Sequence, residues 1–390
     1  MLILKLAFRN LLGAGLRTWL NVLALSFSFV VIIFLQGIYN GMNAQAERAS
    51  VEALYGGGQY WHPRYDPYDP LSLMDAHGPV PARLDSLRTV GLATPILIRQ
   101  ATIYPGGRFQ SVLLEGIDPD QDVLTVPSAL LRGGDDVIPA LIGTRMAKTT
   151  GLRPGDQVTV QWRDVHGTFD AADLRIRQVM RTLVPEIDNG QIWLPLERLR
   201  RITDMPGEAT FVVLRRDGPG PAPGTGWTPR DLAYLLQDIR ALRRTKSIQA
   251  SIVYVFLLFV AMLAIFDTQV LSIFRRKREI GTLMALGMTR VQVIELFTLE
   301  GALHSVLAAG AAAVYGLPLL AYEAAKGFEL PVDTQAFGFA FGERIFPIYS
   351  VALVVGTTAL VLVVTTVVSF LPPRKIAKLK PTDALRGRMA

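Results

Sequence analysis

Residues 345–371 read IFPIYSVALVVGTTALVLVVTTVVSFL, a run of 27 residues without one charged side chain. A helix rises about 1.5 Å per residue, so about 20 apolar residues are enough to cross a hydrocarbon core about 30 Å thick. Helices of soluble proteins average about 10–14 residues and usually keep a polar face. The run therefore predicts a transmembrane helix, which we place at residues 347–371.

Three other stretches of the 390-residue chain share this length and low charge. Hydrophobic residues make up 50% of the chain, and the 19% that are charged lie almost entirely outside these stretches. The four predicted transmembrane helices cover residues 19–39, 248–274, 293–322 and 347–371. The 208 residues between the first two helices are enough to bury a core of their own.

The net charge of +7 is unevenly distributed, and its distribution predicts the topology. Residues 40–247 contain 24 basic and 24 acidic side chains, and the loop from Glu323 to Arg344 has four acids and two bases. The excess of bases lies in three short segments, made by Lys5, Arg9 and Arg17, by Arg275–Arg278 and Arg290, and by Arg374, Lys375, Lys378, Lys380, Arg386 and Arg388. Short basic loops stay in the cytoplasm. Both termini are therefore expected in the cytoplasm and the large domain outside, with no nucleic-acid partner.

The segments between the spans complete the predicted organisation. The first segment mixes leucines with bases, as in a helix lying along the inner leaflet, so membrane lipids are expected partners. The segments are a cytoplasmic amphipathic helix at 1–18, an extracytoplasmic domain at 40–247, a cytoplasmic helix at 275–292, an extracytoplasmic loop at 323–346 and a cytoplasmic tail at 372–390.

The large domain alternates strand-like and helix-like patterns. Runs with period two or with β-branched residues predict strands, and short helical patterns lie between them. Strands are predicted at 92–104, 111–117, 157–162, 174–182, 191–194 and 210–214, and helices at 81–90, 143–150 and 196–202. This order predicts an α+β domain with a mixed sheet. The fold class is thus integral membrane α-helical, with four transmembrane helices and a large α+β extracytoplasmic domain inserted between helices 1 and 2.

Helices are predicted to join this domain to the membrane at both of its ends. The first span continues as a helix until Gly56–Gly58 breaks it, and the Pro- and aromatic-rich residues 59–81 are expected to be an extended loop. The stretch GPGPAPGTGW, residues 218–227, is predicted to be a hinge. Thr228 is then expected to cap a helix with Pro229 at its first position, which runs into the second span without a breaker.

The sequence contains no motif for catalysis or nucleotide binding. No G-x-x-x-x-G-K-[ST] loop and no G-x-S-x-G elbow occur, and the four histidines lack the spacing of zinc ligands. The chain has no cysteine, which excludes disulfides and thiolate chemistry. A metal held by His62, Asp66 and Asp69 is the alternative to a solvated loop. We therefore expect a non-catalytic chain without a metal or cofactor of its own.

Acidic residues within the predicted spans are candidates for intramembrane polar sites. Asp267 lies shortly before the basic cluster, which favours a position near the inner membrane surface. Glu295 and Glu300 lie near the start of the third span, at the depth of the lipid headgroups. The alternative for all three is an interfacial polar group without a function.

The segment RRKREIGTLMALGMTRVQVIELFTLEG, residues 275–301, is the most informative part of the chain. It continues from a basic run into a short amphipathic helix that Gly287 ends. An apolar surface exposed in the cytosol must be covered by a partner protein or by lipid, and both remain open here. That surface is predicted to consist of Ile280, Leu283, Met284 and Leu286.

This segment resembles the loop between the second and third spans of the FtsX-like permeases of ABC transporters, the superfamily of MacB, LolC/LolE and FtsX. The tail PPRKIAKLKPTDALR, residues 372–386, resembles the ending of that family. The opening LKLAFRNLLGAGLRTWLNVLAL and the stretches VLLEGIDPD and ALIGTRMAKTTGLRPGDQVTV resemble it as well. The resemblance therefore covers nearly the whole chain, in order.

The resemblance implies a permease subunit in the bacterial inner membrane, with a porter-like external domain. Cytoplasmic ABC ATPase subunits, which bind ATP and Mg, would be partners, together with a second permease copy or paralogue. The ATPase subunits would engage a coupling helix at about 277–288. Its ATPase-coupling residues would be Lys277, Arg278, Glu279, Ile280, Gly281, Leu283, Met284, Leu286 and Gly287.

The implied activity is mechanotransmission, in which ATPase closure moves the external domain on a lipoprotein, lipid or peptide-like substrate. A periplasmic or outer-membrane partner is also implied. The lipoprotein-releasing members have a Pro-rich hook, whereas the corresponding residues 163–178 read RDVHGTFDAADLRIRQ. One alternative is an FtsX-like membrane regulator that activates a cell-wall hydrolase. Another is a membrane-anchored enzyme or sensor that uses residues 59–69.

Overall fold

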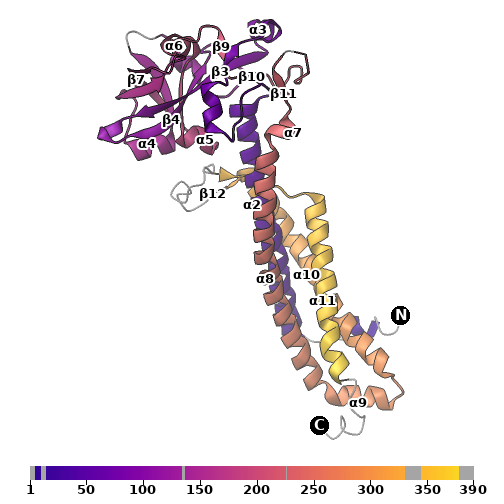
Figure 1. The fold of residues 1–390 in the computed structure, drawn as a ribbon. Coiled ribbons are helices and arrows are strands. Elements are labelled where there is room, and N and C mark those ends of the chain that lie inside the picture. Colours follow the sequence, from indigo (N-terminus) through magenta and orange to yellow (C-terminus); the bar gives the residue numbers. More distant parts are fainter. Residues whose placement is uncertain (1–4, 10–14, 134–136, 225, 330–343, 377–390) are drawn as a thin grey trace. The chain divides into compact units, whose positions relative to one another are not determined.

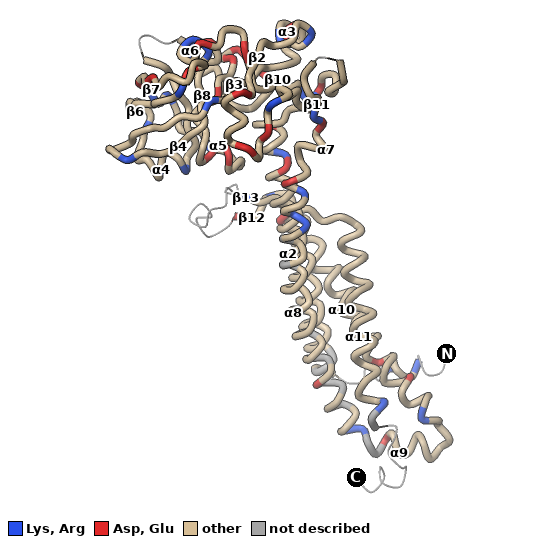
Figure 2. The backbone as a smooth tube through the Cα atoms, viewed as in Figure 1, with Lys and Arg blue, Asp and Glu red and all other residues tan. Residues whose placement is uncertain are grey.

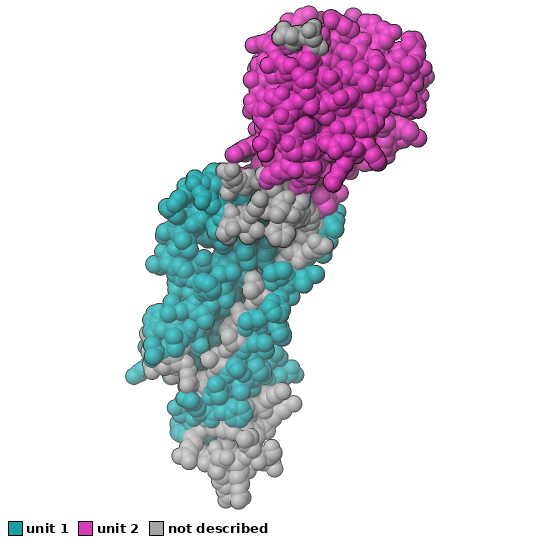
Figure 3. Space-filling view, turned by 90° about the vertical axis from the view of Figure 1, so that its left-hand side faces the viewer, with its two compact units in different colours: residues 1–42, 243–329, 344–390 teal, residues 43–242, 330–343 magenta. Residues whose placement is uncertain are grey.

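The computed structural model describes residues 5–9, 15–133, 137–224, 226–329 and 344–376. The chain divides into two compact units (Figure 3). We call residues 1–42, 243–329 and 344–390 the helical unit, and residues 43–242 and 330–343 the sheet unit. The predicted tail after residue 376 and most of the predicted loop at 323–346 lie outside the described residues.

The sheet unit is built on one mixed sheet (Figure 1). Its nine strands are β1 (Gln59–Trp61), β3 (Ala93–Ile103), β4 (Gln110–Ile117), β5 (Ile138–Gly143), β6 (Gln157–Arg163), β7 (Phe169–Met180), β8 (Gln191–Pro195), β10 (Phe211–Leu214) and β11 (Thr228–Arg230). They follow the order β11-β1-β10-β3-β4-β8-β5-β7-β6. β4 and β8 are parallel, as are β5 and β7, and the other pairs are antiparallel. The predicted α+β domain with a mixed sheet is therefore present.

An additional pairing of β3 with β6 closes six of these strands into a barrel. Along β6, Val158, Val160 and Trp162 are buried while the residues between them are more exposed, so one face of the strand points into the barrel. The helix α6 (Leu196–Ile202) adds Leu196 and Leu199 to the same core. The barrel interior is thus filled by apolar side chains.

A second core covers the other part of the sheet. It contains Trp61, Trp193 and Phe211 from the strands. The same cluster includes Ala53 from the π-helical segment η1 (Val51–Tyr55) and Leu235 from α7 (Leu232–Leu235). The helical segments η1 and α7, near the first and last residues of the main part of the sheet unit, are therefore packed against its sheet by apolar contacts.

Most elements predicted for the sheet unit are present, with helices α3 (Ala82–Thr89) and α4 (Thr144–Thr150) close to their expected places. Two expectations at its edge were wrong. Residues 59–61 form β1 instead of a loop, and residues 228–230 form β11 because Trp61 pairs with Thr228. Pro229 is tolerated there because β11 is an edge strand.

The helix after this edge begins later than expected. Asp231, not Thr228, is its N-cap, and the Asp231 side chain accepts from the Tyr234 N–H at 2.9 Å. The helix is also interrupted, since α7 ends at Leu235 and α8 (Gln237–Arg275) begins one residue after Leu236. The uninterrupted helix expected from Thr228 into the second span is therefore wrong. β5, formed by a short run of buried residues, was not predicted.

The helical unit contains long apolar helices where the spans were predicted. These are α2 (Leu16–Ser50), α8, α10 (Arg290–Lys326) and α11 (Val351–Ile376), with the short α9 (Lys277–Ala285) between α8 and α10. Figure 2 shows few charged residues along their middle parts. Among the described residues, three helices are long and apolar enough to cross a membrane, at Trp19–Tyr55, Arg290–Lys326 and Val351–Arg374. Within the described residues of α8, only the shorter apolar segment Ser251–Val260 qualifies, so four spans remain a prediction.

Close packing in the helical unit depends on small residues. Phe29 and Ile33 of α2 pack with Ala308 and Ala312 of α10 and Val361 of α11. This is the packing expected of helices in lipid, where small residues let backbones approach.

Two glycines of α2 show how close this approach is. A Cβ on Gly41 would lie 2.1 Å from the Phe346 carbonyl oxygen, and one on Gly37 would overlap the Tyr349 ring. The Ile348 N–H also donates to the Gly37 carbonyl at 3.0 Å. The segment before α11 is therefore seated directly on the backbone of α2.

Candidate coupling site

The turn from α8 through α9 to α10 holds the residues that the sequence analysis singled out. α8 ends at Arg275, and Arg276 leaves the helical conformation with φ −94° and ψ 14°. After α9, Gly287 adopts φ +101°, a conformation that favours glycine. Thr289 then starts α10 with a capping box in which Thr289 and Gln292 bond each other's backbone N–H. Each bend in this turn thus has a local cause in the sequence.

An apolar cluster fastens α9 to the two long helices. Ile280 of α9 is buried against Ile273 of α8 and against Val293 and Phe297 of α10. Met284 is half-buried at the edge of this cluster. One face of α9 is therefore occupied by packing within the chain.

Arg276 adds a polar connection at the same place. Its Nε donates to Glu279 of α9 at 2.8 Å, and its Nη1 donates to both carboxylate oxygens of Glu300 of α10, at 3.0 and 3.2 Å. The guanidinium group also lies 5.2 Å from the centre of the Phe297 ring. The Glu300 side chain is only 7% exposed, so this pair is shielded from water in the chain. Arg276 thereby links all three helices.

This arrangement changes which face of α9 is available to a partner. Ile280 was expected to contribute to an exposed apolar surface, but it is 4% exposed because it packs on Phe297. Gly281 is also buried, and Leu283 is half-buried like Met284. Of the predicted coupling residues, Glu279, Gly287 and Leu286 are exposed, the last by 80%. Thr282 and Ala285 of α9 are exposed as well. The backbone of Lys277 and Arg278 starts α9, and their side chains lie outside the described part.

The acids predicted as intramembrane polar sites fall into two kinds. Asp267 and Glu295 are exposed on α8 and α10. Glu300 is buried and paired with Arg276, and its backbone carbonyl bonds the His304 ring at 2.7 Å. Sequence analysis missed this pair because its two residues are 24 positions apart and no local pattern connects them.

The weak metal alternative has no geometric support among the described residues. No group of three or more His, Asp and Glu side chains that could hold a metal ion occurs there. His62 lies against the Trp227 ring, 5.8 Å between centroids, and its Nδ1 accepts from the Arg64 N–H. Asp66 and Asp69 accept backbone N–H groups of their own loop. These residues therefore stabilise local turns.

The geometry defines a class of protein. It is a membrane protein with several long apolar helices, a separate sheet-based unit, and a short surface helix fastened between two of the long helices. Residues 251–381 match the family described as FtsX-like permease C-terminal. This match over part of the chain, together with the relatives described next, supports an ABC transporter permease of the FtsX, MacB and LolC type.

Two curated relatives agree with this. The chain is 22% identical over 325 residues to the lipoprotein-releasing system transmembrane protein LolC of Neisseria meningitidis serogroup B (strain MC58), covering 75% of this chain and 77% of that protein. It is 26% identical over 151 residues to the macrolide export ATP-binding/permease protein MacB of Shewanella sp. (strain ANA-3). That match covers 38% of this chain but only 20% of MacB.

A solved structure is also similar in part. The extracellular domain of the noncanonical ABC-type transporter YknZ from Gram-positive bacteria matches 41% of this chain and 83% of its own length, at 13% identity. The TM-score is 0.26, so the superposition is too loose to define the fold of the sheet unit.

Proposed function

We propose that the chain is the non-catalytic permease subunit of an ABC transporter and works by mechanotransmission. ATP and Mg bind to a separate cytoplasmic ATPase, which engages α9. The resulting movement passes through the long helices to the sheet unit on the other side of the inner membrane. The sheet unit then acts on a lipoprotein, a lipid or a peptide-like substrate. Two permease subunits, identical or paralogous, pair in the membrane.

The observation that carries this proposal is the attachment of α9. Arg276 and the cluster around Ile280 fasten α9 to α8 and α10 at once. A short helix held in this way cannot tilt without displacing the ends of both long helices, because packed side chains transmit strain. Glu279 on α9 and Leu286, the residue directly after it, remain exposed and offer one charged and one apolar contact to a partner.

Helix continuity supports the second half of the path. α2 and α8 each begin in one unit and end in the other. Within the sheet unit, Arg240 of α8 pairs with Glu47 of α2 at 2.9 Å, and Asp238 of α8 accepts from the Tyr68 hydroxyl. In the helical unit, the Tyr39 hydroxyl of α2 donates to the Arg243 carbonyl of α8 at 3.0 Å. The two helices are thus bonded to each other on both sides of the unit boundary.

The relatives support the division of labour. The name of the MacB relative joins an ATP-binding part to a permease part, and this chain matches only a fifth of that protein. The chain itself has no phosphate-binding loop motif. We therefore assign ATP hydrolysis to another subunit. The LolC relative is named for lipoprotein release, which makes a lipoprotein the first substrate to test.

The proposal is tested by purifying the chain with the ATPase subunit that accompanies it and measuring ATP hydrolysis in lipid nanodiscs. Glu279→Arg combined with Leu286→Asp should lower the stimulated rate at least tenfold, or prevent copurification, because both exposed contacts are reversed and the bond from Arg276 to Glu279 is lost. Phe109→Asp is the control, since Phe109 is 80% exposed but lies in the sheet unit, outside α2 and α8. It should change the rate less than twofold. Full activity of the double variant would refute the coupling role of α9.

A further inference from the structure

The sheet unit contains a cleft of about 400 Å³. It lies between the 3-10 helix η2 (Pro70–Met74), the second half of β3, and the end of β6 with the turn that follows it. Its volume falls within the range of about 300–1,000 Å³ that is typical of sites for small ligands. None of the residues assigned to coupling lines it. The cleft is therefore a separate site of the size that a small molecule fills.

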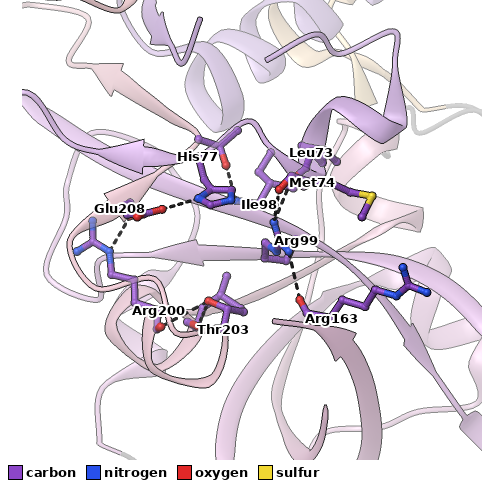
Figure 4. Close-up of polar contacts among 11 residues, drawn as sticks. Leu73, Met74, His77, Ile98, Arg99, Arg163, Arg200, Thr203 and Glu208 are labelled. Carbon is purple, nitrogen blue, oxygen red and sulfur yellow. Dashed lines mark hydrogen bonds and ion pairs between the residues drawn. The ribbon is translucent and has the colours of Figure 1, made fainter. Parts of the chain in front are cut away.

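Arg99 holds the walls of the cleft in place. Its Nη1 donates to the Leu73 and Met74 carbonyls at the end of η2, at 3.0 and 3.3 Å, and its Nη2 donates to the Arg163 carbonyl at the end of β6, at 3.2 Å (Figure 4). The Arg99 residue is only 5% exposed. Because one buried guanidinium group ties both walls to β3, the cleft is preformed.

The β3 backbone beside the cleft is closed to a ligand. Leu97, Ile98 and Arg99 are at most 5% exposed, and the Ile98 N–H already donates to the Thr210 hydroxyl at 3.0 Å. A ligand that adds a strand to a sheet needs free backbone groups along the edge that it joins. An occupant of this cleft must therefore be held by side chains and not by strand pairing.

Three polar side chains of the lining already have partners. The Nε2 group of Gln100 donates to a carbonyl of η2 at 2.9 Å, and Oε1 of Gln161 accepts from the Tyr104 hydroxyl at 2.8 Å. The Asp164 carboxylate accepts two backbone N–H groups of its own turn, at 2.9 and 2.8 Å. A polar ligand would have to replace these bonds, and exchanging one hydrogen bond for another gives little net affinity.

The apolar side chains of the lining, in contrast, are left in contact with solvent. Four of them are exposed although they line the cleft: Leu71 by 70%, Phe169 by 59%, Met74 by 46% and Val165 by 39%. Apolar side chains gathered in this way mark interaction sites. Covering them removes apolar surface from water, which is the main source of free energy that this lining offers to a ligand.

The charges of the lining cancel. The charged residues that line the cleft are two cations and two anions, Arg99, Arg163, Asp75 and Asp164. The Arg163 guanidinium group lies 4.4 Å from the centre of the Phe169 ring, so this cation is stacked on an apolar wall. A ligand with a net charge would lose hydration without meeting an excess of opposite charge. The lining therefore favours an uncharged ligand.

We propose that this cleft binds a small, uncharged and mainly apolar ligand. The ligand is held by burial of apolar surface against Leu71 on the η2 wall and Phe169 at the start of β7. A hydrocarbon chain of a lipid and a free apolar molecule share this chemistry. Binding is a property of the sheet unit and does not depend on the proposed coupling to an ATPase.

The test uses the full chain in lipid nanodiscs without any ATPase. The probe is benzophenone, a neutral apolar molecule that bonds covalently to nearby C–H groups when it is illuminated. Mass spectrometry of the digested chain then locates the label, which separates probe in the cleft from probe dissolved in the lipid. We expect labelled peptides from η2 or from the turn between β6 and β7. Leu71→Ser combined with Phe169→Ser should lower the yield of these peptides at least tenfold.

The matched control is Phe109→Ser combined with Leu130→Ser. These residues are 80% and 43% exposed and lie outside the cleft lining, so labelling of the cleft should change less than twofold. Circular dichroism checks that both double variants remain folded. An unlabelled cleft, or equal losses of label in the two variants, would overturn the proposal.

Charged analogues with the same photochemistry test the second part of the proposal. The anion 4-benzoylbenzoate and the cation (4-benzoylbenzyl)trimethylammonium should each label the cleft at least tenfold less than benzophenone. Equal labelling by either ion would contradict an uncharged ligand. Competition then separates the two sources, and either result agrees with the proposal. If only decanol displaces benzophenone the cleft takes a hydrocarbon chain, and if only naphthalene does so it takes a compact apolar molecule.

Discussion

The two units of this chain arrange their apolar residues in opposite ways. In the sheet unit the largest side chains are inside, with Trp162 and Trp193 at most 2% exposed. In the helical unit many apolar side chains such as Val314, 79% exposed, face outward, and small residues such as Ala308 and Ser305 are fully buried beside a few large ones such as Phe29. In water, burying apolar surface is favourable, so the sheet unit places its large apolar side chains inside. In lipid this driving force is absent, so the helical unit can expose apolar side chains. An apolar residue in the sequence therefore predicts burial in the sheet unit but not in the helical unit.

The largest expected effect is the loss of a core side chain from the sheet unit. Trp162→Ala removes a ring from the barrel interior and the bond from its Nε1 to the Ile202 carbonyl, 3.0 Å long. It should destabilise the sheet unit by about 3–5 kcal/mol. Phe109→Ala, which truncates an aromatic ring that is 80% exposed, should change stability by less than about 0.5 kcal/mol. Thermal unfolding followed by near-ultraviolet circular dichroism measures both, and similar midpoints would contradict the packing described.

In the helical unit the comparable effect comes from a polar pair. Arg276→Met leaves the Glu300 carboxylate buried without its partner and should cost about 3 kcal/mol. Adding Glu300→Met removes the orphaned charge, so the double variant should be more stable than the single one. Arg275→Met, at the exposed neighbouring arginine, should change stability by less than about 0.5 kcal/mol. Unfolding in detergent measures the series. Additive losses would mean that the pair is not coupled.

Exposed positions provide the next contrast. Val314→Asp on α10 puts a charge where we expect lipid and should cost about 2.5–3.5 kcal/mol of insertion free energy. Val90→Asp in the sheet unit, at a residue 65% exposed, should cost less than about 0.5 kcal/mol. Yields of membrane-inserted protein and thermal midpoints in detergent report the difference. Equal tolerance at the two positions would show that the outer face of α10 meets water.

The smallest effect in this series concerns a polar residue inside the sheet unit. Glu115 is 2% exposed, and burial raises the pKa of its carboxyl group from 4.5 to about 8. Between these values the folded chain keeps the proton that the unfolded chain releases, so stability falls as pH rises through this window. From pH 6 to pH 8 the loss should be about 2–3 kcal/mol. Urea unfolding at several pH values measures it.

Glu115→Gln should abolish this pH dependence, because the amide does not ionise. Glu186→Gln, at an exposed acid of the same unit, is the control and should keep the slope of the unaltered chain. If the Glu115→Gln variant kept that slope, another group would be responsible for it.

Local patterns predicted much of the fold. The period-two or β-branched runs of β3, β4 and β6 and the long apolar runs were enough to place those elements within a few residues. β1 and β11 were not predicted because their pairing joins Trp61 to Thr228, and neither segment has a strand pattern of its own. Closure of the barrel by β3 and β6 is likewise a non-local event, visible only once both strands are placed.

The candidate site shows the same limit. The basic run and Gly287 predicted a short helix between two spans, and α9 is there. Which face of α9 is exposed could not be predicted, because it depends on Ile280 packing against Phe297. The link from Arg276 to Glu300 could not be predicted either, since hydrophobic periodicity says nothing about which buried charges meet.

The most direct test of the account is the side of the membrane on which each unit lies. The chain has no cysteine, so single cysteines can be introduced without background labelling. Val90→Cys in the sheet unit and Leu286→Cys after α9 are both well exposed. In spheroplasts, a membrane-impermeant maleimide should label Cys at position 90 at once and Cys at position 286 only after permeabilisation. Labelling of both from the same side would contradict the transmission of movement from α9 across the membrane to the sheet unit.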